Sequence, residues 1–189
     1  MYSTIRILRS EHTALVALLR AASSMAAKSR ERAELPDFKV LRAMLFYIVE
    51  FPERHHHRKE SELLFARLRA RTPLARPLLD HLDDDHARGD ARIREVEHEL
   101  VAFEMLGESR RAAFEASLER YVDFYLVHMS LEEREVFPLA ERVLGARDWE
   151  ELDADFAANV DPLTKVDPEA AYVDLFARIK PHLQASDWP

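Results

Sequence analysis

The chain of 189 residues contains no cysteine, only three glycines and no long hydrophobic run. Because cysteine is absent, disulfides, thiolate nucleophiles, Cys-ligated zinc and thiolate-bound iron–sulfur clusters are excluded. The glycines, Gly89, Gly107 and Gly145, lie far apart, so they cannot form a glycine-rich phosphate-binding loop. The longest strictly apolar run, at 43–49, is far too short to span a bilayer, so no membrane partner is expected.

An excess of basic residues is also missing. The chain has 27 Lys and Arg against 35 Asp and Glu, which gives a formal net charge of −8. Nucleic-acid surfaces need clustered Lys and Arg to contact phosphates, so no nucleic-acid partner is expected. The N-terminal sequence Met-Tyr-Ser-Thr-Ile-Arg does not have the pattern of a signal peptide, and the cytoplasm is the expected location.

The residues that are abundant, Ala, Leu, Glu and Arg, favour helix. Four long segments repeat apolar residues at helical spacing, at about 3–28, 36–70, 72–106 and 108–144. They predict an all-α, up-down-up-down four-helix bundle. Ser3 is the expected N-cap of the first helix. Pro52 predicts a kink or short break in the second helix, just before His56.

The C-terminal part of the chain has a different pattern. Two short additional helices are predicted, at about 148–159 and 167–183. Residues 1–145 are therefore expected to form the bundle and residues 146–189 a helical extension. Trp149, Trp188 and these helices either pack on their own bundle or cover a homodimer surface.

The chain has nine histidines, more than a helical protein of this kind requires. His56 is followed four residues later by Glu60, and His128 is followed in the same way by Glu132. Upstream of each pair, a lone histidine follows an acid: Glu11 precedes His12, and Asp85 precedes His86. The two halves of the chain thus repeat one arrangement, which indicates two helix pairs packed with approximate two-fold symmetry.

This arrangement points to metal. Residues four apart share one face of a helix, and both His-x3-Glu pairs lie on apolar stripes that should face the bundle axis. Burying an unpaired carboxylate costs several kcal/mol, and no stripe Lys or Arg is placed to neutralise the two acids. A pair of divalent cations would do so, and imidazole with carboxylate suits iron, manganese or zinc. The candidate ligands are His12, His56, Glu60, His86, His128 and Glu132. Gly89, one turn after His86, is expected to leave room at the site.

The other five histidines are expected to lie away from the site. His81 and His98 fall off their stripes, and His182 is in the tail. His55 and His57 flank His56 and should point elsewhere, since neighbouring residues are separated by about 100° around an α-helix. A register shift at Pro52 would change this for His57, which could then act as a ligand or support one.

These residues resemble the hemerythrin-like, HHE-type cation-binding domains. The matching segments, which cover roughly residues 1–145, are RSEHTAL, FPERHHHRKESELLF, LDDDHARG and HMSLEEREVFP. The resemblance implies a four-helix bundle around a non-haem diiron centre, with the six candidates as ligands and the two Glu as bridging carboxylates. The O₂ carriers of the family have a fifth histidine one turn before the position of His86, and here that position is Leu82. The resemblance therefore favours a more open site, or one that recruits water, Glu53 or another donor.

The resulting hypothesis is a non-haem diiron protein that senses or reacts with O₂, nitric oxide, peroxide or iron, rather than carrying O₂ in bulk. Its cofactors would be two iron ions, with manganese or zinc as substitutes, and its partner a small diatomic ligand or peroxide. One alternative is a ferritin-like diiron oxidoreductase, for which Glu53-x2-His56 and Glu95-x2-His98 are a poor match. A metal-free helical interaction module and a structural zinc site are two others.

Overall fold

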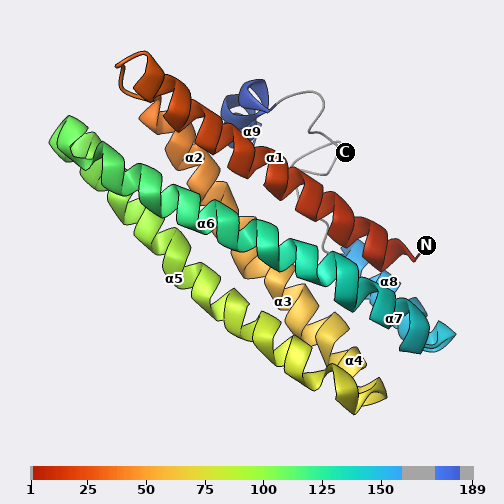
Figure 1. Cartoon of the computed structure of the whole chain (residues 1–189). Helices are drawn as coiled ribbons and strands as arrows, with labels where there is room; N and C mark the ends of the chain where they lie inside the picture. The colour runs from red at the N-terminus through yellow and green to blue at the C-terminus, as the bar shows by residue number, and fades with distance from the viewer. Residues whose placement is uncertain (1, 159–172, 184–189) are drawn as a thin grey trace.

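The computed structural model describes residues 2–158 and 173–183. Every regular element within these residues is a helix (Figure 1). The first long helix is α1 (Ser3–Glu31), and the third consists of η3 (Pro73–Ala75) and α5 (Arg76–Leu106). The second runs through α2 (Phe38–Ile48), η1 (Val49–His56), α3 (His57–Lys59), η2 (Glu60–Phe65) and α4 (Ala66–Arg71). The fourth runs through η4 (Gly107–Arg110), α6 (Arg111–Leu131), η5 (Glu132–Val136) and α7 (Phe137–Val143).

These four helices lie side by side along one direction, joined by short connections (Figure 1). Short connections make consecutive helices antiparallel, so the predicted up-down-up-down four-helix bundle is confirmed. The tail adds α8 (Ala146–Ala158), α9 (Val173–Ile179) and η7 (Lys180–His182). Residues 167–172 of the predicted last helix, and Trp188, lie outside the described residues. The domain boundary at residue 145 stays a prediction.

The second helix does not break at Pro52. It continues instead through a π-helical segment, η1, in which the His57 N–H donates to the Pro52 carbonyl five residues earlier. Proline cannot donate to an α-helical hydrogen bond, and wider π-helical turns accommodate this loss without interrupting the helix. Two further π-helical segments, η2 and η5, begin at Glu60 and Glu132. All three π-helical segments therefore lie at residues that the sequence assigns to the site.

The core consists of two hydrophobic clusters separated along the bundle. One contains residues such as Leu15, Leu45 and Ile93, and the other contains Ile5, Leu64 and Leu79. On each long helix the candidate site residues lie where the stretch that contributes to one cluster gives way to the stretch that contributes to the other. The polar site thus occupies the middle of the bundle, with an apolar layer on either side.

The extension helix α8 is part of this packing. Its Trp149, Leu152 and Phe156 are buried in the second cluster together with Ile5 of α1. Asp153 of α8 accepts hydrogen bonds from the backbone N–H groups of Ser3 and Thr4, at 3.2 and 2.7 Å. The predicted N-cap Ser3 is therefore wrong: Tyr2 occupies that position without a side-chain bond, and a residue 150 positions away satisfies the helix start.

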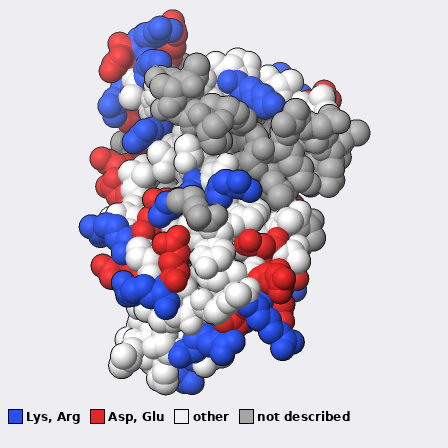
Figure 2. Space-filling model, turned by 90° about the vertical axis from the view of Figure 1, so that its right-hand side faces the viewer, with Lys and Arg blue, Asp and Glu red and all other residues white. Residues whose placement is uncertain are grey.

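The outer surface is charged with both signs. Basic and acidic side chains are interspersed on the face shown in Figure 2. Elsewhere along the described chain, exposed side chains of opposite sign form pairs such as Arg58 with Glu62, and Arg147 with Glu151. Among the described residues, no helix combines the length and apolar composition needed to cross a membrane.

Candidate metal centre

The fold brings all six predicted residues together. Each long helix contributes at least one: His12 comes from α1, His56 and Glu60 from η1 and η2, His86 from α5, and His128 and Glu132 from α6 and η5. Glu60 and Glu132 are fully buried. The most accessible of the six is His86, whose side chain is 9% exposed.

Glu60 lies among imidazoles from three helices. Its oxygens are 3.3 Å from His56 Nε2, 3.6 Å from His86 Nε2 and 3.8 Å from His12 Nε2. Because ring nitrogens from three helices converge on this one side chain, it can be shared between neighbouring metal ions.

Glu132 lies in an equivalent position. Its oxygens are 3.3 Å from His12 Nε2, 3.5 Å from His128 Nε2 and 3.9 Å from His86 Nε2. The predicted two-fold repeat of the sequence therefore becomes two facing carboxylates, each surrounded by imidazole nitrogens.

Nε2 of His86 lies 3.1 Å from Nε2 of His128, but several other polar atoms at the centre of this cluster have no hydrogen-bond partner. Both carboxylate oxygens of Glu60, both of Glu132 and Nε2 of His12 are buried in this way. Native structures satisfy almost all of their buried polar groups, so such a concentration requires an explanation. Nitrogen and oxygen donors arranged around a common space fit metal ions such as iron, manganese or zinc.

The outward-facing ring nitrogens are held by a surrounding set of polar groups. His56 Nδ1 donates to Glu11 at 2.7 Å, and His12 Nδ1 donates to Glu133 at 3.0 Å. Ser61 Oγ lies 3.0 Å from His86 Nδ1. Such contacts fix the tautomer and orientation of metal-binding histidines, and they leave Nε2 directed at the metal.

A buried cation, Lys59, also lies beside the site. Its ammonium group contacts the two oxygens of Glu11 at 2.8 and 3.1 Å, and the residue is 7% exposed. The expectation that no Lys or Arg on the apolar stripes neutralises Glu60 and Glu132 concerns other acids, because Lys59 lies off the stripe and pairs with Glu11. Burial alone would raise the pKa of Glu11, but His56 and Lys59 outweigh it and lower that pKa to about 2.

The two central acids have opposite pKa shifts. Burial, followed by the charge of Glu132, raises the pKa of Glu60 well above its usual value. Burial acts on Glu132 too, but His128 and His12 outweigh it and lower its pKa. Of the two acids, Glu60 is therefore the one whose environment favours the protonated form, and a bound cation would oppose that protonation.

The pKa values of the candidate histidines also shift in opposite directions. Burial lowers the pKa of His56 and of His86, which keeps these imidazoles in the neutral form that binds metal. Burial would also lower the pKa of His12, but Glu132 and Glu133 outweigh it and raise that pKa to about 9. His12 is therefore the histidine that must lose a proton before it can bind a metal ion.

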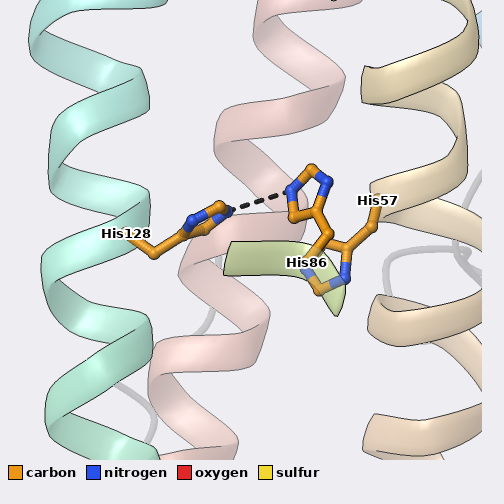
Figure 3. A group of neighbouring side chains, drawn as sticks. All are labelled: His57, His86 and His128. Carbon is orange, nitrogen blue, oxygen red and sulfur yellow. Dashed lines mark hydrogen bonds between the residues drawn. The ribbon is translucent and has the colours of Figure 1, made fainter. Parts of the chain in front are cut away.

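One histidine that the sequence placed outside the site lies in it. His57 is 5% exposed, and a ring nitrogen of His57 lies within 4.8 Å of ring nitrogens of His86 and His128 (Figure 3). The expectation that it points away was wrong, and the stated exception, a register shift at Pro52, applies. Each residue of η1 turns through a smaller angle than in an α-helix, and this lag, added over the segment, shifts the register so that His57 as well as His56 faces the interior.

The remaining histidines lie outside the centre, as expected. His55, His98 and His182 are exposed, and the His81 side chain is 54% exposed. Leu82 is fully buried among apolar residues, and its hydrocarbon side chain has no atom that could bind a metal ion.

Two alternatives lose support from these positions. In the ferritin-like pattern Glu95 and His98 would be ligands, yet both are exposed. A metal-free interaction module requires the six polar residues to face solvent, yet they are gathered inside the bundle.

Gly89 does not leave an open position at the centre. A Cβ atom there would overlap the Tyr125 hydroxyl and lie 3.2 Å from Glu53 Oε1. The space beside this glycine is thus filled by a tyrosine and a carboxylate. The expectation that Gly89 makes room for a ligand is corrected accordingly.

Comparison with known protein families matches residues 3–140 to the family described as the hemerythrin HHE cation binding domain. The matched range contains all six candidate ligands and His57, and it ends before α8. No curated protein and no solved structure was found to match the chain.

Proposed function

Because the chain belongs to the hemerythrin family of HHE cation-binding domains, we propose that it holds two iron ions and senses or reacts with O₂, nitric oxide, peroxide or iron. The ligands would be His12, His56, His86 and His128, with Glu60 and Glu132 shared between the two ions. The observation that carries this proposal is the set of four buried carboxylate oxygens without hydrogen-bond partners.

The donor set supports iron over softer metals. It contains imidazole nitrogens and carboxylate oxygens and no sulfur, and manganese or zinc could substitute. Bound iron would supply a redox-active centre able to bind a small diatomic molecule or peroxide. Two carboxylates would balance much of the cationic charge, which makes burial of the ions between apolar layers affordable.

The chain's own groups prepare this centre. Glu11, Glu133 and Ser61 orient three of the rings through Nδ1. Phe65 and Phe137 stack on His86 and His12, at 5.9 and 5.7 Å between ring centroids, and keep water from that side. Leu82 supplies no nitrogen where the O₂ carriers of the family have one, which supports a sensing or redox role over bulk O₂ carriage.

Metal analysis tests this proposal directly. Protein purified in air after growth with iron should contain about two iron ions per chain and absorb in the near ultraviolet, and O₂, nitric oxide or peroxide should change that absorption. Protein without stoichiometric metal would contradict the proposal.

A matched set of variants tests the ligand assignment. Changing both His56 and His128 to Ala should abolish most of the iron content. His55→Ala is the control, because His55 neighbours His56 but is exposed. Full iron loading of the double variant would exclude these two residues as ligands.

A further inference from the structure

A buried acid beside the centre is not among the six candidate ligands. The Glu53 side chain is 3% exposed, and its Oε1 accepts hydrogen bonds from Tyr125 at 2.6 Å and from Tyr121 at 2.9 Å. Its other oxygen, Oε2, lies 3.1 Å from His57 Nδ1. One oxygen is thus held by two hydroxyl groups, and the other faces a histidine.

The two helices opposite Glu53 are shaped to fit this group. Tyr121 and Tyr125 lie one turn apart on α6 and are fully buried. Gly89 of α5 provides the space for the Tyr125 hydroxyl, since a Cβ atom at that position would overlap it. A buried carboxylate with two buried tyrosines is costly to desolvate, and its hydrogen bonds compensate only while all partners are in place.

The ring of His57 is confined between aromatic neighbours. It stacks on His86 with ring centroids 4.2 Å apart and 11° between the planes, and on Tyr125 at 5.4 Å and 2°. His57, His86 and His128 face one another across the bundle (Figure 3). Because Nδ1 faces Glu53, Nε2 is the ring nitrogen that remains for a metal ion.

We propose that His57 is a further ligand of the metal centre and that Glu53, held by Tyr121 and Tyr125, is the positioning residue that orients it. This inference rests on the proposed function. It completes a three-histidine group, His57, His86 and His128, that no single helix could provide. The His57 nitrogen would come from α3 in the second long helix, not from the position of Leu82 on α5, so the centre would still differ from that of the O₂ carriers.

The arrangement repeats the support seen at the other histidines. Glu11 is hydrogen-bonded to Nδ1 of His56, and Glu53 Oε2 lies within ion-pair distance of Nδ1 of His57, at 3.1 Å. A carboxylate in this position fixes the ring and raises its basicity as a ligand. A network with only a packing role would hold the tyrosines in place but would have no effect on bound metal.

The test uses the full-length protein and iron as the probe. His57→Gln should lower the iron content and shift the near-ultraviolet absorption, and Glu53→Gln should weaken iron binding by about 10–100-fold with a similar spectral shift. Tyr125→Phe should have a smaller effect of the same kind, because Tyr121 still holds Glu53. The matched controls are His55→Gln, an exposed neighbour, and Tyr2→Phe, a tyrosine stacked on Trp149 away from the site.

The outcomes separate this inference from the proposed function. If the unmodified protein takes up no iron, both are wrong. If it loads iron, and His57→Gln and Glu53→Gln load equally with unchanged absorption, only the inference is wrong. Should His57→Gln fail to fold by circular dichroism, Glu53→Gln decides, since the amide keeps the size of the side chain.

Discussion

Glu11 and Glu53 support neighbouring histidines on the second helix but are stabilised in different ways. Glu11 lies on α1 and contacts His56 and the ammonium group of Lys59. Glu53 contacts His57 and accepts hydrogen bonds from two neutral tyrosines. The first acid is therefore balanced by a cation, and the second by hydroxyl donors. A site between apolar layers can thus hold two supporting carboxylates with only one buried lysine among these partners.

The largest effect should come from removing a carboxylate that both iron ions would share. Glu60 lies within 3.8 Å of His12, His56 and His86, so Glu60→Ala should lose both iron ions. His56→Ala should retain up to about one ion, because the group of His86 and His128 stays intact. Metal analysis of the purified variants measures this difference.

Glu62→Ala is the control for this pair, since Glu62 is an exposed carboxylate two residues away. Equal iron content in Glu60→Ala and His56→Ala would mean that the two iron ions do not share Glu60.

A smaller effect should separate the two supporting acids by stability. Glu11→Gln removes the carboxylate beside the buried ammonium of Lys59, and it should lower the free energy of unfolding by about 3–5 kcal/mol. Glu53→Gln keeps a hydrogen-bond acceptor for the tyrosines and should cost about 0.5–1.5 kcal/mol. Urea unfolding of the metal-free proteins provides both values.

The exposed pair of Arg58 and Glu62 gives the baseline for this comparison. Glu62→Gln should change the free energy of unfolding by less than about 1 kcal/mol. Equal losses of unfolding free energy for Glu11→Gln and Glu53→Gln would show that the charge of Lys59 is not what distinguishes Glu11 from Glu53.

The smallest effect on the metal centre should come from a residue that lies outside it. Asp153→Ala removes the acceptor for the first N–H groups of α1 and should cost about 0.5–2 kcal/mol. Iron content should not change, because Asp153 acts at the end of the bundle. Thermal unfolding and metal analysis of the same sample test this, and a loss of iron would show that α8 contributes to the centre.

Much of the site could be predicted because helix periodicity is a local property. The spacing of His56 and Glu60, and of His128 and Glu132, places each pair on one face of any helix, and the apolar neighbours indicate that this face is buried. The structure brings both pairs together with His12 and His86. The number and order of the long helices followed from the same pattern.

The residues that were missed depend on contacts between distant parts of the chain. Lys59 meets Glu11 across 48 residues, and Asp153 reaches the start of α1 across 150. The local sequence around Lys59 or Asp153 does not predict which distant residue each one contacts. Such pairs are settled by how the helices pack, and packing follows from the whole set of side chains.

Spacing along single helices was enough to predict the helical bundle and the six candidate ligands. The position of His57 at the centre became evident only from the folded chain. Each residue of an α-helix turns by about 100°, and the smaller turn per residue along η1 shifts the register so that His57 lies toward the interior. The same packing placed Tyr121, Tyr125 and Gly89 around Glu53, because a buried carboxylate must find its partners on whichever helices lie next to it.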